Sequence, residues 1–232
     1  NRLLERIRVM FDAQRRFVAD AAHELRTPIT ALVVQTENLE QADLSQDGRD
    51  RLASLRTGIR RTGHLLEQLL TLAKYDGDIS KDKPKGEFDR VLKEVVSELL
   101  PVAQNKSVDL GFCRIEPVLV PLEPVALTVL ARNLLDNALR HTPAGGQVDV
   151  SLFAENGSVV FTVEDTGSGI PDADFDRIFE PFFRGSRSRG EGSGLGLSIA
   201  RRIIERCHGS IRLENKSAPG SGLRVIVRIP RD

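Results

Sequence analysis

Cysteine is scarce in this sequence of 232 residues, which contains only Cys113 and Cys207, far apart along the chain. Two cysteines cannot form the disulfide framework of a small secreted domain, and so low a number suits a reducing compartment. We expect both to be buried apolar side chains rather than reactive thiols.

An excess of charge is also missing, because 33 lysines and arginines balance 33 aspartates and glutamates. Composition therefore favours neither nucleic acid nor an acidic ligand as a partner, and we expect no nucleic acid. No apolar run approaches the roughly 20 residues of a membrane helix, and no signal peptide is present. The chain begins at an asparagine within a helical pattern. We therefore expect a fragment of a longer protein, with any membrane anchor upstream of Asn1.

The first third of the sequence has the periodicity of helices. Apolar residues recur at helical spacing over residues 1–75, and turn-forming residues interrupt them only at 44–50. This pattern predicts a helical hairpin. Two helices alone bury little surface, so the long apolar stripe predicts a homodimer that forms a four-helix bundle.

The remainder of the sequence alternates between two periods. Residues 76–87 are charged, contain glycine and proline and show no period, which indicates a linker. Helical patterns at 89–105, 122–141 and 195–208 then alternate with β-rich runs at 148–165 and 210–230. The first β-rich run contains Glu-Asn-Gly, a typical hairpin turn. We expect an α+β unit in which helices cover one face of a sheet.

The segment FVADAAHELRTPIT, residues 17–30, carries the first candidate chemistry. At about 100° per residue, His23 lies nearly opposite the apolar face of its helix. A neutral imidazole is a competent nucleophile, Glu24 could orient its proton, and Thr27 on the same face could position a water. Pro28 predicts a bent or loosened turn beside His23. Ordinary solvated side chains and a tolerated kink are the alternative interpretation.

The segment NLLDNALRHT places Asn133, Asn137, Arg140 and His141 on one face of a helix. An amide oxygen is a plausible hard ligand for Mg²⁺, and Arg140 could contact phosphate oxygens. A solvated polar stripe is the alternative.

The segment VEDTGSGIP ends a predicted strand with Asp165. Its carboxylate could accept a hydrogen bond from an exocyclic amine, while Gly167 and Gly169 would let a flat base approach the backbone. A plain loop is the alternative, because glycines mark turns in many proteins.

A third glycine-rich segment, GSGLGLSIA, leads into a helix. Gly192, Gly194 and Gly196 stand at its N-terminus, where free N–H groups and the helix dipole favour a phosphate. It matches neither a dinucleotide-binding fingerprint nor a Walker A loop. The preceding FEPFF contributes three phenylalanines, Phe179, Phe182 and Phe183, which we expect to be packing residues.

Together these segments resemble the transmitter region of the sensor histidine kinases of two-component signalling. The matching segments are FVADAAHELRTPIT (the H box), NLLDNALRHT (the N box), DTGSGIP (the G1 box), FEPFF (the F box) and GSGLGLSIA (the G2 box). The resemblance covers the chain from about Arg15 onward. Residues 1–14 are similar to the end of a HAMP signalling helix, a less specific pattern.

The resemblance implies the domain organisation and the fold. It implies a dimerisation and histidine-phosphotransfer hairpin at 15–76, a linker at 77–86 and an ATP-binding catalytic domain at 87–232. The fold class is then α+β, with a dimeric four-helix bundle followed by a Bergerat-type α/β sandwich.

The resemblance also implies residue roles. His23 corresponds to the phosphoacceptor, Glu24 to its acid/base partner, Asn137 to a Mg²⁺ ligand and Asp165 to the residue that binds the adenine amine. The other positions implied to contact ATP are Asn133, Arg140, His141, Gly167, Gly169, Gly192, Gly194, Leu195 and Gly196.

The implied activity is autophosphorylation of His23 by ATP, followed by transfer to an aspartate in the receiver domain of a response regulator. Glu24 and Thr27 match the pattern that the family links to dephosphorylation of that regulator. The implied location is the cytoplasmic part of a bacterial inner-membrane sensor.

Two alternatives stay open. One is an ATPase of the gyrase, MutL or Hsp90 type, although Asn133 stands where those hydrolases carry a glutamate base. The other is a non-catalytic dimeric signalling scaffold.

Overall fold

The computed structural model describes residues 28–40, 45–74, 85–185, 193–216 and 221–231. The chain divides into two compact units, Asn1–Gly77 and Asp78–Asp232. Within the described ranges, no helix combines the length and the hydropathy that a membrane crossing requires.

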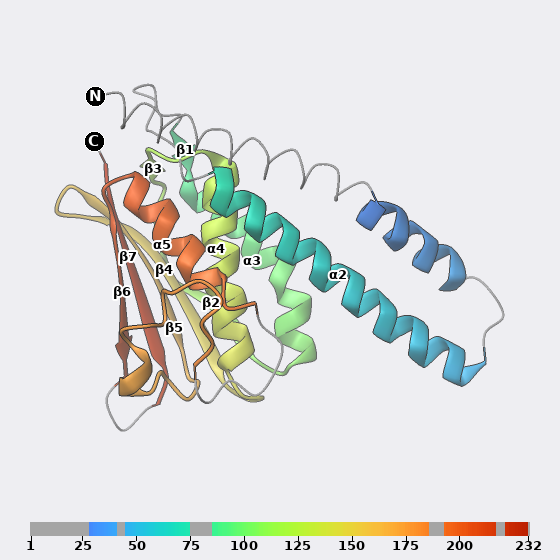
Figure 1. The fold of residues 1–232 in the computed structure, drawn as a ribbon. Coiled ribbons are helices and arrows are strands. Elements are labelled where there is room, and N and C mark those ends of the chain that lie inside the picture. Colours follow the sequence, from blue (N-terminus) through green and yellow to red (C-terminus); the bar gives the residue numbers. More distant parts are fainter. Residues whose placement is uncertain (1–27, 41–44, 75–84, 186–192, 217–220, 232) are drawn as a thin grey trace. The chain divides into compact units, whose positions relative to one another are not determined.

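The first unit contains two described helices (Figure 1). Residues 28–40 form one, and α2, Gln46–Lys74, forms the other. Ser45 begins α2 because its hydroxyl accepts a hydrogen bond of 3.2 Å from the Gly48 N–H, one of the donors that lack a partner within the helix.

The two helices run antiparallel. Arg56 of α2 forms an ion pair with Glu40 at the end of the first helix. A Cβ added to Gly63 would lie 3.4 Å from a methyl carbon of Ile29, near the start of that helix. The predicted helical hairpin is therefore confirmed. Several of its apolar side chains are nevertheless exposed in the single chain, namely Leu32, Val34, Leu39 and Leu55.

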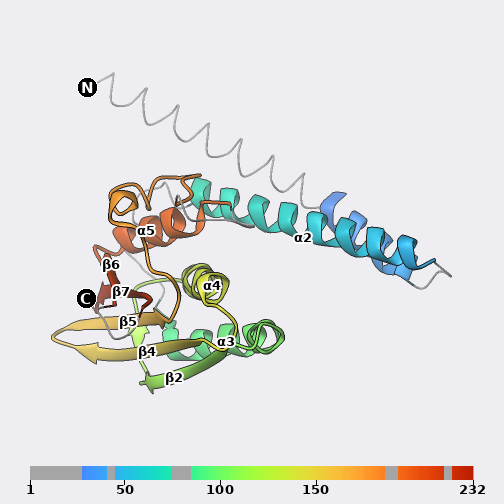
Figure 2. The same cartoon turned by 90° about the horizontal axis from the view of Figure 1, so that it is seen from below.

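The second unit is a layered structure with a five-stranded sheet of order β2-β4-β5-β7-β6. Only the β2–β4 pair is parallel. Its elements, in chain order, are β1 (Gly86–Glu87), α3 (Phe88–Asn105), β2 (Asp109–Ile115), β3 (Leu119–Val120), α4 (Pro124–His141), β4 (Gln147–Glu155), β5 (Ser158–Asp165), a short 3₁₀ helix (Asp172–Asp174), α5 (Gly196–Arg206), β6 (Ser210–Asn215) and β7 (Leu223–Pro230). Helices α3, α4 and α5 cover one face of this sheet, as Figure 2 shows. The expected layer of helices on one face of a sheet is confirmed.

The core lies between this face and the helices. Val150, Val163 and Val225 stand side by side across β4, β5 and β7 and are buried. Phe161 on the same face packs edge-on against Phe88 of α3, with ring centroids 5.0 Å apart. Burying each such side chain contributes about 1.5–3 kcal/mol, so this layer fixes the sheet against the helices.

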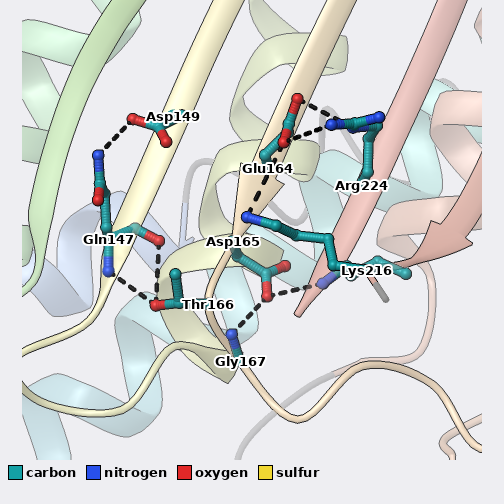
Figure 3. Close-up of polar contacts among 9 residues, drawn as sticks. Gln147, Asp149, Glu164, Asp165, Thr166, Gly167, Lys216 and Arg224 are labelled. Atoms are coloured by element: carbon teal, nitrogen blue, oxygen red, sulfur yellow. Dashed lines mark hydrogen bonds and ion pairs between the residues drawn. The ribbon is translucent and has the colours of Figure 1, made fainter. Parts of the chain in front are cut away.

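The alternation of side chains along β5 decides where its two acidic residues point. Asp165 pairs in register with Val148, which is buried on the helix-facing side. Glu164 is one residue earlier and therefore faces the opposite side, where its carboxylate is 2.9 Å from Arg224 (Figure 3). The period of two thus places the last carboxylate of β5 under the helices.

The predicted hairpin turn is confirmed. Strand β4 ends at Glu155 and β5 begins at Ser158, with φ angles of 47° at Asn156 and 76° at Gly157. Two successive positive φ angles are typical of the turn that suits the twist of a hairpin.

The expectation that both cysteines are buried is half wrong. Cys207 is buried, but Cys113 is exposed. It lies on the edge strand β2, where the register with β4 shifts between Phe112 and Arg114 and leaves Cys113 without a paired position. A hydrogen bond with Asp149 is the main cause of a raised pKa for the Cys113 thiol.

Candidate functional site

A cavity opens where the C-terminal end of β5 meets α4 and the start of α5. It holds about 580 Å³ of empty space, including the part that is open to solvent. The lining residues come from α4, the loop after β5, the start of α5 and the start of β7: Asn137, His141, Asp165, Ser168, Gly169, Ile170, Pro171, Asp174, Ile178, Gly185, Leu197 and Leu223.

Asp165 is the most buried charged group in this lining, with 3% of its surface exposed. Its Oδ1 accepts two backbone hydrogen bonds, from the N–H of Gly167 at 2.7 Å and from that of Leu223 at 3.1 Å (Figure 3). Burial raises the pKa of Asp165, and the two hydrogen bonds oppose that rise. None of the described residues donates a hydrogen bond to Oδ2, so this oxygen is available to a donor on a ligand.

Two glycines allow the backbone to close around Asp165. A Cβ at Gly167 would lie 2.6 Å from the carbonyl oxygen of His141. A Cβ at Gly222 would lie 1.9 Å from the carbonyl oxygen of Asp165. Gly167 was predicted to shape this site, whereas Gly222, within the β-rich run 210–230, was not.

The loop after β5 is held by β6. The side-chain amide of Asn215 accepts a hydrogen bond from the N–H of Ile170 at 2.8 Å and donates one to its carbonyl oxygen at 2.7 Å. Gly169 precedes Ile170 with a φ of 66°, and a Cβ there would lie 2.6 Å from Asn215 Oδ1. Gly169 therefore needs both its positive φ and its missing side chain.

The four predicted polar residues of α4 do not all reach the cavity. Asn137 and His141 line it, whereas Asn133 and Arg140 are not among the lining residues. Asn133 is buried, and its amide nitrogen donates to the carbonyl oxygen of Val129 at 2.9 Å. The 3.6-residue period groups these positions only approximately, so each contacts a different neighbour.

Arg140 and His141 stand in the last turn of α4. Burial and the neighbouring Arg140 guanidinium lower the pKa of His141, while Asp165 opposes that effect. Arg140 itself is exposed and extends the positive charge toward solvent.

Sequence reasoning did not identify Lys106, which follows α3. Its ammonium donates to the carbonyl oxygens of Leu139 at 2.6 Å and Arg140 at 2.7 Å, in the last turn of α4. Partial burial, and secondly Arg140, lower the pKa of Lys106. The local sequence NKS gives no sign of this contact, because Leu139 and Arg140 lie 33 and 34 positions after Lys106 in the chain.

The start of α5 borders the same cavity through Leu197. Leu195 is fully buried and anchors the turn, and its N–H donates to the Ser193 hydroxyl at 3.2 Å. Gly194 has a φ of 70°, and a Cβ at Gly196 would lie 3.1 Å from Asn133 Oδ1. Gly194 needs its positive φ and its missing side chain, whereas a Cβ at Gly196 would require the Asn133 side chain to shift by a few tenths of an ångström.

The expectation that all three phenylalanines of FEPFF are packing residues is wrong for Phe182. Its side chain is 65% exposed and its φ is 65°. Gly194 lies against the Phe182 backbone: the Phe182 N–H donates to the Gly194 carbonyl oxygen at 3.0 Å, and a Cβ added to Gly194 would be 2.6 Å from the Phe182 carbonyl carbon. Phe179 and Phe183 are half-buried, and each lies under an arginine guanidinium, Arg201 and Arg177 respectively.

Four predicted residues lie outside the described ranges, namely His23, Glu24, Thr27 and Gly192. The predicted bend before Pro28 lies there as well. Pro28 itself is the first described residue, and it is helical and exposed.

Two family models match the chain. Residues 13–78 match the family described as the His Kinase A (phospho-acceptor) domain. Residues 123–232 match the histidine kinase-, DNA gyrase B- and HSP90-like ATPases.

Individual relatives and structures agree with both matches. The sensor protein QseC of Escherichia coli O157:H7 is 40% identical over 208 residues, which make up 88% of this chain and 45% of that protein. The sensor protein kinase PmrB of Pseudomonas aeruginosa is 37% identical over 234 residues, covering 100% of this chain and 48% of PmrB. The chain thus spans about half the length of these curated relatives. The crystal structure of full-length ShkA in complex with AMPPNP matches with a TM-score of 0.73 and 25% identity, over 93% of this chain and 45% of that chain.

A hairpin that matches a phospho-acceptor family is thus followed by a sheet and helices that match an ATPase family, and an ATPase domain of this family binds ATP. QseC and PmrB, whose names describe a sensor protein and a sensor protein kinase, align with 88% and 100% of this chain. The chain belongs to the sensor histidine kinases, with a phospho-acceptor domain followed by an ATPase domain of the histidine kinase type.

Proposed function

We propose that this chain transfers the γ-phosphoryl group of ATP to His23 and then to an aspartate of a response-regulator receiver domain. The observation that carries this proposal is the cavity at the end of β5, where a buried Asp165 keeps one carboxylate oxygen available. A hydrogen-bond acceptor among apolar and glycine neighbours suits the exocyclic amine of adenine.

The base end of the site is held by backbone contacts. Gly167 and Gly169 leave room for a flat ring, and Ile170 supplies apolar surface beside it. Because the Oδ1 atom of Asp165 is already fixed by two N–H groups, Oδ2 meets the amine without further ordering. These contacts would recognise the base of the nucleotide and not its phosphates.

The phosphate end lies along α4 and the start of α5. Asn137 lines the cavity, and its side-chain oxygen is a hard donor of the kind that Mg²⁺ accepts. Mg²⁺, when bound, neutralises charge on the triphosphate. Arg140 and the first N–H groups of α5 at Gly196 supply positive potential for the phosphate oxygens.

The transfer step needs a nucleophile, for which we propose His23. A ring nitrogen of His23 forms a bond to the γ-phosphorus while the bond from that phosphorus to the bridging oxygen of ADP breaks. Glu24 takes or orients the proton on the other ring nitrogen. We further propose that Thr27 positions a water when the regulator is dephosphorylated.

The domain boundaries belong to the same proposal: a phosphotransfer hairpin at 15–76, a linker at 77–86 and a catalytic domain at 87–232. The exposed leucines of the hairpin, Leu32, Leu39 and Leu55, support a homodimer that covers them. The lengths and names of the relatives support a cytoplasmic segment of a membrane sensor.

Labelling with ATP tests the proposal. With Mg²⁺ and ATP labelled at the γ-phosphate, the wild-type chain should acquire a phosphoryl group that is acid-labile and base-stable. Asn137→Ala should reduce the labelling rate by about tenfold or more, because a metal ligand is lost. Asn105→Ala is the matched control, since Asn105 is an exposed residue at the end of α3.

Two results would contradict the proposal. One is the absence of any protein-bound label in a folded wild-type chain. The other is release of inorganic phosphate at a steady rate without a phosphorylated protein, which is the behaviour of a hydrolytic ATPase.

A further inference from the structure

The last turn of α4 is held by a charged side chain from another helix. Lys106 follows α3 and donates to the carbonyl oxygens of Leu139 and Arg140, at 2.6 Å and 2.7 Å. These carbonyls belong to the last turn of α4, where the helix has no intrahelical donors left for them. A cation at this position both satisfies the carbonyls and complements the helix dipole.

We propose that Lys106 is a positioning residue for the nucleotide phosphates. It fixes the last turn of α4, which carries Arg140 and His141 and follows Asn137 by one turn. The inference rests on the proposed function, because it takes the phosphates to lie along this turn.

The neighbouring connections support this role. The N–H of Gly145 donates to the carbonyl oxygen of Ser107 at 2.7 Å, and the N–H of Asp109 donates to that of Gly146 at 2.9 Å. The chain that follows α3 therefore holds both the end of α4 and the loop after it. Lys106 is the only charged group among these contacts of the described residues.

The position of Lys106 also places its charge beside that of Arg140. Two cations in proximity repel each other, and the effect is visible as a lowered pKa of Lys106, for which partial burial is the larger cause. The ammonium of Lys106 is bound to two carbonyl oxygens, whereas the Arg140 side chain is exposed to solvent. Lys106 thus holds the backbone of the turn from which the Arg140 side chain extends.

Three nucleotide ligands separate this role from general stability. Adenosine has no phosphates and therefore reports the base end, where Asp165 on β5 makes no direct contact with Lys106 in the described structure, and Gly167 lies against the His141 carbonyl at the end of α4. ADP and ATP add two and three phosphates. Lys106→Met keeps the aliphatic stem and removes the donors, and Lys106→Arg keeps both charge and donors.

The experiment measures equilibrium dissociation constants of the full 232-residue chain for the three ligands with Mg²⁺, together with amide hydrogen exchange without ligand. Lys106→Met should weaken ATP binding by about fivefold, with a smaller loss for ADP and the smallest for adenosine. Amide exchange in residues 139–142 should become faster, and Lys106→Arg should restore both properties. Lys93→Met is the matched control, because Lys93 on α3 makes only an exposed ion pair with Asp89, at 3.3 Å.

The outcomes are distinct. If the wild-type chain binds no ATP, the proposed function fails. If it binds ATP but Lys106→Met binds all three ligands as the wild type does, the role of Lys106 is refuted. An equal loss for adenosine and ATP, or a loss of ATP binding with unchanged amide exchange, would also refute it, since the first indicates a structural role and the second a direct phosphate contact.

Discussion

At the scale of single residues, Asp165 is a buried acidic residue at the place where we propose that the adenine amine binds. A buried carboxylate is expensive to ionise, which is why burial raises its pKa. An apolar residue at this inward-facing position would pack against Val148 without that cost. The charge is retained where a ligand amine would meet it.

We expect Asp165→Asn to weaken binding of a non-hydrolysable ATP analogue about tenfold to a hundredfold. A hydrogen bond to a charged group contributes about 1.5–3 kcal/mol, and each 1.4 kcal/mol is about tenfold in affinity. Thermal stability of the free chain should not fall at neutral pH, because the variant removes a buried charge. Calorimetry of both proteins gives the two quantities.

The affinities of the wild-type chain and of Asp165→Asn should depend on pH in different ways, because the pKa of Asp165 is raised. The carboxylate form binds the amine, so its advantage over Asp165→Asn should shrink as pH falls through the raised pKa of Asp165. For folding the sign is opposite: the cost of the buried charge is absent at low pH and grows as pH rises through that pKa. A ratio of affinities that stays constant between pH 8 and the onset of acid unfolding would contradict this account.

At the scale of elements, the β6–β7 pair holds the base end of the site at two points. The Asn215 side chain bonds both backbone groups of Ile170, and the Leu223 N–H bonds Asp165 Oδ1. Strands far apart in sequence therefore fix the loop after β5. The loop is shaped by these contacts more than by its own residues.

We expect Asn215→Ala to weaken adenosine and ATP binding equally, by about fivefold, since two exposed hydrogen bonds together contribute about 1 kcal/mol. Amide exchange at Ile170 should become faster. Glu214→Ala is the control, because Glu214 precedes Asn215 and is exposed on β6. Unchanged amide exchange at Ile170 in Asn215→Ala would contradict this, because the loop after β5 would then keep its conformation without Asn215.

Local patterns predicted most of these elements, and long-range contacts account for the failures. The three helices of the second unit and the turn at Asn156 were predictable from period and turn chemistry. Asp165 was found because a strand ends there. Lys106 and Asn215 were missed because their partners lie 33 to 45 residues away, and Cys113 because an edge-strand bulge has no signal in the sequence.

At the scale of the whole molecule, the proposed function requires both units of the chain. The proposed nucleotide site belongs to Asp78–Asp232, and the proposed acceptor His23 belongs to Asn1–Gly77. Because each unit has its own role, a substitution at the acceptor should leave nucleotide binding intact. This separation is the central claim of the proposed function.

The most direct measurement compares phosphoryl labelling and ATP binding in the wild-type chain and in His23→Ala. We predict that the variant binds the ATP analogue with unchanged affinity and acquires no acid-labile, base-stable label, whereas the wild type is labelled within the same time. A label that persists in His23→Ala, with the same stability to base, would contradict the account.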